Sequence, residues 1–235
     1  MKTIIPFCLT LIILLGSAGC DESPSFKKSM DAFKSGDFVT AVRHWKPLAE
    51  GGNSAAQRYL GMAYISGEGV PQDRKTAQKW LRLASEQGDA LAQFYLGEMY
   101  ANGWGVPENF KTAVKWYTLA AENGYLEAQN KLARMYHVGD GVPQDKKTAA
   151  KWYKHAAEKG DAAAQRILGV MYAVGAGIAQ DYVYGYMWVE LAAGQGDESA
   201  KALKDNEIFK KMTPSQLETA KKLARECVRK NYKGC

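Results

Sequence analysis

The sequence predicts an all-α protein, a right-handed α-solenoid of stacked antiparallel helix pairs. The first observation is a repeat: glycines recur every 36 residues along most of the 235-residue chain, and such periods are typical of repeat arrays. The second is helical spacing of apolar residues inside each unit, and the third is a Gly- and Pro-containing connector in the middle of each unit. The glycines are Gly52, Gly88, Gly124, Gly160 and Gly196.

Each unit contains two predicted helices and one connector. In the first unit, Leu60 and Tyr64 lie four residues apart within an apolar stripe, which is the spacing of one helix face. Residues 67–73 then read G-E-G-V-P-Q-D. Glycine can end a helix with a positive φ, proline cannot continue one, and Asp can cap the next helix. A second helix carries Trp80 and ends at Gly88.

The repeated residues follow the pattern A-x-Q-x-x-L-G-x-x-Y-x-x-G-x-G-V-x-x-D-x-x-x-A-x-x-W-x-x-x-A-x-x-x-G. This pattern resembles Sel1-like repeats, which are relatives of the tetratricopeptide repeat. The resemblance covers four 36-residue units over residues 53–196. It implies stacked helical hairpins and work as a protein-interaction scaffold.

Two flanking segments extend the array. Residues 26–52 predict a capping helix pair in which Trp45 lies one place later than the register, and residues 197–235 predict capping helices and a basic tail, with a closing helix from about Pro214 to Arg229. The fourth unit also departs from the pattern, with Ala179 in place of Pro. Atypical terminal units are expected, because they must cover the exposed edges of the core.

The amino end predicts export from the cytoplasm. Residues 1–19 have a basic start, a short apolar run and small residues, the order of a secretory signal peptide. Cys20 follows and resembles the acylated cysteine of bacterial lipoproteins, with residues 20–25 as a tether; Asp21 favours the inner membrane by the same resemblance. Ser17-Ala18-Gly19 also suits an ordinary leader peptidase, which would give a soluble periplasmic or secreted protein.

Two cysteines remain after the leader and Cys20, and an oxidising compartment favours a disulfide between Cys227 and Cys235. Residues 200–235 hold ten Lys or Arg against four Asp or Glu, a net charge of +6. This segment could face anionic lipid, or its charges could only solvate helix faces. We expect no nucleic-acid partner for an exported chain.

No catalytic or metal-binding pattern is found, and we predict no cofactor. The three histidines, His44, His137 and His155, are scattered through the repeats and fit structural or surface roles. The Gly-x-Gly of each connector follows a helix and not a strand, so it does not fit a dinucleotide site.

Partner recognition is therefore expected where the repeats differ, on the concave surface of the solenoid. Two equivalent positions one turn apart, together with an aromatic connector residue, supply the predicted partner-binding residues, which are Arg58, Met62, Phe94, Glu98, Trp104, Asn130, Arg134, Arg166 and Val170. Aromatic residues beside arginines are typical of interaction hot spots. Local packing over a loop is the alternative for Trp104.

These observations favour a non-enzymatic scaffold that binds a protein or peptide of the bacterial cell envelope, with the membrane contacted through Cys20. The first alternative comes from cysteine-rich Sel1-like proteins that resemble penicillin-binding or β-lactam-hydrolysing enzymes. Those proteins carry a cysteine pair in each repeat, and residues 21–226 contain no cysteine. The second alternative is a released factor that acts on a host.

Overall fold

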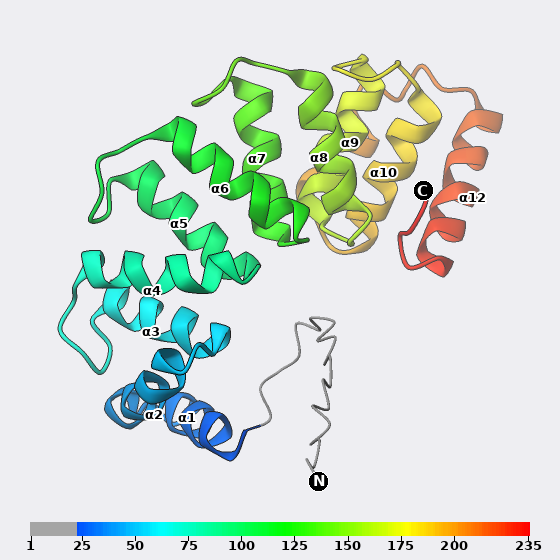
Figure 1. Cartoon of the computed structure of the whole chain (residues 1–235). Helices are drawn as coiled ribbons and strands as arrows, with labels where there is room; N and C mark the ends of the chain where they lie inside the picture. Colours follow the sequence, from blue (N-terminus) through cyan, green and yellow to red (C-terminus); the bar gives the residue numbers. More distant parts are fainter. Residues whose placement is uncertain (1–22) are drawn as a thin grey trace, which may run out of the picture.

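The structure, a computed structural model, describes residues 23–235. The predicted leader and Cys20 lie outside this range. The described residues form helices and no strand, so the all-α repeat fold is confirmed, and successive helix pairs follow a curved path (Figure 1). The helices are α1 (Pro24–Lys34), α2 (Phe38–Glu50), α3 (Ser54–Ser66), α4 (Arg74–Glu86), α5 (Ala90–Asn102), α6 (Phe110–Glu122), α7 (Leu126–Val138), α8 (Lys146–Ala157), α9 (Ala162–Val174), α10 (Tyr182–Gly194), α11 (Glu198–Lys204) and α12 (Pro214–Arg229).

The four repeats each contribute a first and a second helix. We call the first helices (α3, α5, α7 and α9), with α1 and α11 in line, the A row, and the second helices (α4, α6, α8 and α10), with α2 in line, the B row. The helices of one repeat pack antiparallel, and each B helix then packs on the A helix of the next repeat. This order makes every repeat depend on its neighbours for a covered core.

Side-chain caps and glycines set the helix boundaries. Asp73 begins α4 by accepting hydrogen bonds from the amides of Lys75 and Thr76, as expected of an N-cap carboxylate. Gly103 ends α5 in the left-handed region at φ 65°. Two residues later, a Cβ added to Gly105 would lie 2.6 Å from Cβ of Arg74, so this connector requires glycine for close contact with the preceding B helix.

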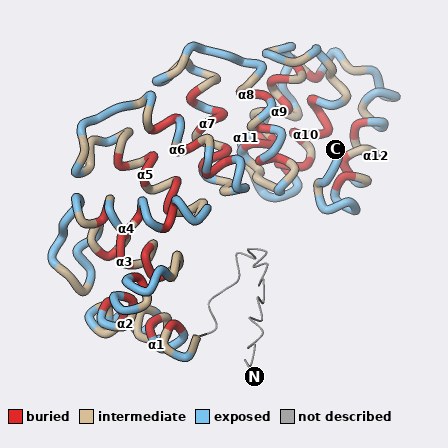
Figure 2. The backbone as a smooth tube through the Cα atoms, viewed as in Figure 1, coloured by how far each residue is buried: buried red, intermediate tan, exposed pale blue. Residues whose placement is uncertain are grey.

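About half of the core residues are alanine and the rest are larger side chains between adjacent helices, and buried residues follow the inner sides of the helices (Figure 2). The closest approach occurs at small residues on the A helices. A Cβ added to Gly97 of α5 would lie 2.5 Å from the ring of Tyr117 in α6. Tyr117 is fully buried, so the large ring fills the space that the glycine leaves.

The repeated tryptophans differ in their burial. Trp80, Trp116 and Trp152 are half-buried, whereas Trp188 is 1% exposed. Trp188 belongs to the same core cluster as Ala224 and Cys227 of α12, and α12 packs on α10. The fully buried side chain of each inner B helix is instead the residue that follows the tryptophan, for example Leu81 or Tyr117.

Buried glutamines join successive repeats. The Nε2 of Gln165 in α9 donates to the carbonyl of Ala157 at the end of α8, at 3.1 Å, and its Oε1 accepts from Gln195 at 2.8 Å. Gln57 and Gln93 make the same pair of bonds. The carbonyl at each helix end also accepts from the amide of the turn glycine, so the glutamine gives it a second hydrogen bond.

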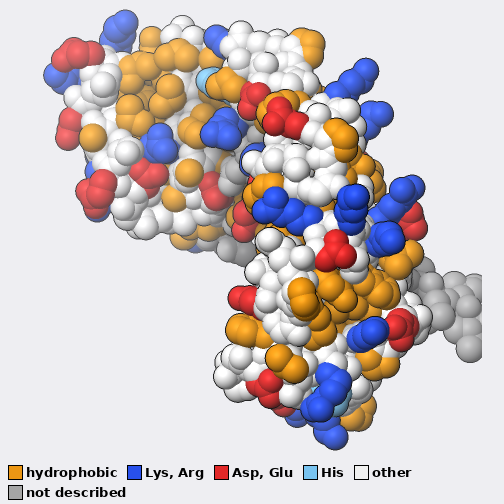
Figure 3. All heavy atoms as spheres, turned by 90° about the vertical axis from the view of Figure 1, so that its left-hand side faces the viewer, with side chains coloured by type: hydrophobic (Ala, Val, Ile, Leu, Met, Phe, Trp, Pro, Cys, Tyr) orange, Lys and Arg blue, Asp and Glu red, His pale blue; other side chains and the backbone are white. Residues whose placement is uncertain are grey.

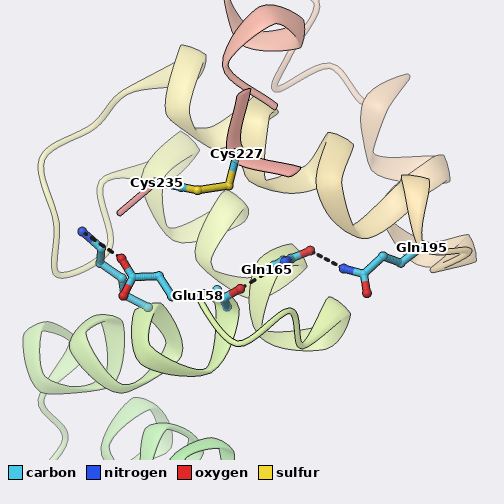
Figure 4. The surroundings of a disulfide bond; sticks show 7 residues. Glu158, Gln165, Gln195, Cys227 and Cys235 are labelled. Carbon is cyan, nitrogen blue, oxygen red and sulfur yellow. Dashed lines mark hydrogen bonds and ion pairs between the residues drawn. A yellow bond between two sulfur atoms is a disulfide. The ribbon is translucent and has the colours of Figure 1, made fainter. Parts of the chain in front are cut away.

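The carboxyl end is held against the third and fourth repeats. Cys227 and Cys235 form a disulfide, which lies near the bonds made by Gln165 (Figure 4). A Cβ on Gly160, in the turn between α8 and α9, would lie 3.1 Å from the ring of Tyr232. The tail therefore folds back over this turn.

Candidate interaction surface

Three of the predicted partner-binding residues link one repeat to the next. Nε of Arg58 lies 2.9 Å from Oδ2 of Asp89, which caps the following A helix. Two equivalent pairs exist in later repeats, Asn130 with Asp161 at 3.1 Å and Arg166 with Asp197 at 3.1 Å. The side chains at this position are half-buried, so the array itself already uses their polar groups.

Asp197 illustrates the electrostatics of these links. Burial favours its neutral form, but hydrogen bonds from the backbone of Ala200 and from the Arg166 guanidinium outweigh that effect and hold the pKa of Asp197 below its usual value. The carboxylate thus acts at once as a helix cap and as an ion-pair partner.

The second repeat replaces the polar link by an aromatic one. Phe94 occupies the position of Arg58, and Tyr125 occupies the position of Asp89. Their ring centroids lie 5.0 Å apart, and Tyr125 makes no side-chain cap bond to α7. Burial, followed by the nearby Glu127 carboxylate, raises the pKa of Tyr125 to about 12, so its hydroxyl stays neutral.

The second predicted position lies one helical turn after the first, and its four residues have different surroundings. They are Met62, Glu98, Arg134 and Val170. Glu98 accepts hydrogen bonds from the Tyr117 hydroxyl at 2.5 Å and from Lys131 Nζ at 2.7 Å. Burial, with the Glu98 carboxylate as the next cause, raises the pKa of Tyr117. Arg134 is exposed, and Val170 is half-buried. Arg134 is therefore the one of these four whose side chain is freely exposed to solvent.

Trp104 packs on its own connector and the neighbouring helix. The Arg74 guanidinium lies over its ring, 5.5 Å from the centroid, and the ring borders the cluster formed by Leu81 and Leu96. This is the local packing that the sequence left as the alternative for Trp104.

Met62, the fourth residue of the second position, lines an aromatic pocket at the amino-terminal end of the array. The pocket has a volume of about 150 Å³ and is formed chiefly by Phe33, Phe38, Trp45, Tyr59, Met62 and Tyr95. Trp45 and Tyr59 stack with centroids 5.0 Å apart and planes 12° apart. The pocket therefore joins the capping pair to the first two repeats, and we call it the aromatic pocket.

The chemistry of the aromatic pocket suits an apolar or aromatic side chain. The Arg58 guanidinium lies over the ring of Tyr59, 4.3 Å from the ring centroid. Trp45 is 2% exposed, and its Nε1 has no hydrogen-bond partner among the described residues. Buried indole N–H groups usually have an acceptor, so Trp45 carries an unsatisfied donor that is shielded from solvent.

Sequence reasoning missed most of this pocket. The aromatic residues of the amino-terminal pair, Phe33 and Phe38, fall outside the 36-residue register, and only the displaced Trp45 indicated that the first pair packs differently. Tyr59 and Tyr95 are in register, one residue after Arg58 and Phe94, where the later repeats have Lys131 and Ile167. This change from tyrosine in the first two repeats to other residues in the last two was the signal in the sequence that could have indicated the pocket.

Residues 23–235 contain no cluster of three or more His, Cys, Asp or Glu side chains arranged to hold a metal ion. Among the described helices, none combines the length and the apolar character needed to cross a bilayer. Two of the three histidine rings lie beside aromatic rings, with His155 5.5 Å from Trp152 and His137 6.3 Å from Tyr153 between centroids.

Solved structures similar to this chain include two proteins of the same architecture. The chain is 30% identical to c5321, a protective antigen of uropathogenic Escherichia coli with an SLR fold, at a TM-score of 0.75, covering 88% of this chain and 46% of that one. It thus spans less than half of the E. coli protein. A Sel1 repeat protein from Oxalobacter formigenes is 33% identical at a TM-score of 0.72, covering 76% of this chain and 73% of that one.

No curated protein matches the chain. The family model for the Sel1 repeat matches residues 54–89, 90–125, 126–161 and 162–197. Each match begins at the first residues of an A helix and ends at the cap of the next one, so the sequence repeat and the structural repeat coincide. Together these matches cover more than half of the sequence, and the chain belongs to the Sel1 repeat family.

Proposed function

We propose that this protein is a non-enzymatic scaffold that binds an envelope protein or peptide through the aromatic pocket and the A row beside it. Sel1 repeat proteins are generally protein-interaction scaffolds. The observation that carries the proposal is the pocket itself, in which aromatic side chains surround open space. An aromatic or aliphatic anchor of a peptide has the complementary chemistry.

The structure leaves fewer of the predicted residues available for partner binding than the sequence suggested. Arg58, Phe94, Asn130 and Arg166 join repeats, so their truncation would disturb the array along with any ligand. Met62 borders the pocket and is half-buried, and Arg134 is exposed on the same row. These two residues are the better probes of partner binding.

A photoreactive residue placed at Met62 tests the proposal in intact cells. We expect a discrete crosslinked product that disappears when Tyr95→Ala opens the pocket wall. The matched control places the same photoreactive residue at Val138, which is 59% exposed at the far end of an A helix. Identical products from both positions, or products that persist in the Tyr95→Ala chain, would refute binding in the aromatic pocket.

Attachment to the membrane through acylated Cys20 is part of the same proposal. Acyl chains contribute about 0.8 kcal/mol per buried CH₂, so several chains hold a protein firmly at a bilayer. We expect Cys20→Ala to move the protein from the membrane fraction to the soluble periplasmic fraction, or to retain the uncleaved leader. Cys235→Ser serves as the control for loss of a cysteine elsewhere. Membrane retention of a Cys20→Ala chain whose leader has been removed would contradict the anchor.

A further inference from the structure

The B row carries a set of exposed cations on equivalent helix faces, an arrangement that the net charge of the whole sequence does not show. On α2, α4, α6 and α8, the positions equivalent to residues 75, 79 and 82 lie four and three residues apart, and therefore on one face of each helix. Ten of the twelve side chains at these positions are Lys or Arg, and all ten are exposed. We call this the basic face; its cations are Arg43, Lys46, Lys75, Lys79, Arg82, Lys111, Lys115, Lys147, Lys151 and Lys154.

Few carboxylates offset these charges. Within the described residues, only Arg82 and Lys154 of the ten form ion pairs, with Glu86 at 3.1 Å and Glu158 at 3.8 Å. Both glutamates lie at the ends of their helices. The aspartates of the array mostly cap helices, as Asp73 and Asp145 do. The cations of the basic face are therefore free to attract an external anion.

The A helices of the four repeats expose few charged side chains. In α3, α5, α7 and α9, the exposed charged side chains are Glu127 and Arg134. The other charged residues of these helices are half-buried, and several are paired within the array, as Arg58 and Glu98 are. Within the repeats, exposed cations are thus concentrated on the B helices, whereas α1 and α11 at the two ends of the A row also carry exposed cations such as Lys27 and Lys201.

Apolar side chains lie among the cations. Leu83 is 44% exposed, Leu119 is 42% exposed and Val39 is 67% exposed. Trp80, Trp116 and Trp152 are half-buried beside them. In Figure 3, Lys and Arg side chains project along the right-hand margin, with patches of hydrophobic side chains between them. Tryptophan and leucine surrounded by lysine and arginine are typical of surfaces that lie in the headgroup region of a bilayer.

The fourth repeat supplies an internal comparison. In α10 the three equivalent positions hold Val183, Met187 and Glu190, and none of them is exposed. This is the helix on which α12 packs, and Met187 shares a core cluster with Ala224 of α12. The cations are therefore present on the four B-row helices that α12 leaves open and absent from the one that it covers.

We infer that the basic face binds the anionic phospholipid surface of a membrane. A bilayer surface matches charges spread over four helices, since each Lys or Arg near anionic headgroups adds to the attraction. The exposed Leu83 and Leu119 can enter the headgroup region while the lysines stay at its surface. The inference does not require Cys20 to be acylated, although an acyl anchor would hold the basic face near the same membrane.

Vesicle binding by the full chain carrying Cys20→Ala, which lacks the acylation site, tests the inference. We expect sedimentation with vesicles of phosphatidylglycerol and phosphatidylcholine in equal parts and much weaker sedimentation with phosphatidylcholine alone. Added salt should weaken binding, because it screens exposed charges. Neutralising one cation on each of three helices, with Lys79→Gln, Lys115→Gln and Lys151→Gln, should lower the partition coefficient by about 100-fold.

The matched control removes the same charge from the A row. Lys27→Gln, Arg134→Gln and Lys201→Gln change one exposed cation on each of α1, α7 and α11, and should leave the partition coefficient within a few-fold of the starting value. Circular dichroism of both triple variants checks that the fold is intact. If the partition coefficient fell equally in the two triple variants, binding would not be specific to the basic face. Equal binding of the unmodified basic face to both vesicle types would overturn the role of its cations, and failure to bind either vesicle type would overturn the membrane assignment and leave an acidic protein as its ligand.

Discussion

Phe94 and Tyr125 contact each other at the one repeat junction where a ring pair replaces the polar link. Their centroids lie 5.0 Å apart, whereas Arg58 and Asp89 form an ion pair at the preceding junction. The exchange involves both partners at once. At this position the second and third repeats are therefore joined by aromatic packing, which salt and acid do not weaken, although the Glu98–Lys131 ion pair also links the two repeats.

A double-mutant cycle with Phe94→Leu and Tyr125→Leu should measure this contact. Aromatic pairs contribute about 0.5–1.5 kcal/mol beyond their buried area, so we expect a coupling energy of that size in urea unfolding. Phe94→Leu combined with Tyr172→Leu serves as the control, because Tyr172 contacts Tyr184 in the fourth repeat, and distant substitutions usually add. A coupling energy near zero for the first pair would contradict a role in joining the repeats.

Gly97→Ala should destabilise the protein. The added methyl would lie 2.5 Å from the Tyr117 ring, and overpacking of a core costs about 1–3 kcal/mol. Gly194→Ala is the matched control, since Gly194 also lies in a helix and a Cβ there meets no atom within 4 Å. The free energy of unfolding from urea denaturation should fall for the first variant and stay equal or rise for the second. An unchanged free energy of unfolding for Gly97→Ala would mean that α5 and α6 can move apart without loss of stability.

The N-cap aspartates should make the array sensitive to acid. Hydrogen bonds from the Thr76 hydroxyl and backbone lower the pKa of Asp73, and the same groups of Thr148 lower the pKa of Asp145. A carboxyl whose pKa is lowered by folding stabilises the folded state above its unfolded pKa, and that stability is lost as the pH falls towards the folded value. Unfolding should therefore become easier below about pH 4.

Substitution by asparagine tests this origin of the acid sensitivity. Asn109 is the natural cap at the equivalent place and accepts from the Thr112 amide at 2.9 Å. Asp73→Asn with Asp145→Asn should keep the caps but reduce the loss of stability between neutral and acid pH. The measurement is the unfolding midpoint in urea at several pH values. An unchanged pH dependence would assign the acid sensitivity to other carboxylates, such as Asp197.

The disulfide should hold the tail over the third repeat. Closing the short loop from Cys227 to Cys235 contributes about 2.5 kcal/mol in the chain-entropy model. Cys235→Ser should lower the unfolding free energy by up to that amount and increase amide exchange in the last turn of α12 and in the tail after it, where Tyr232 lies against Gly160. A reducing agent should destabilise the unsubstituted protein and leave the variant unchanged. Equal melting temperatures with and without reductant would rule out a stabilising disulfide.

The 36-residue register by itself determined the order of the helices and their boundaries. Asp73, Gly103 and Pro107 act through local backbone geometry, which a short stretch of sequence specifies. For the same reason, the closing helix predicted from about Pro214 to Arg229 coincides with α12. These features depend on neighbours in the chain and not on how hairpins pack.

The tertiary structure decided which side chains remain available for binding. Arg58 and Arg166 vary between repeats and suggested an open ladder, but the stacking of hairpins brings the next N-cap aspartate to each of them. The aromatic pocket gathers Trp45, Tyr59 and Tyr95 from three successive helix pairs, and the basic face exists because equivalent helix faces align. The angle and spacing between hairpins arise from packing across the whole core, which the local periodicity of the sequence does not contain.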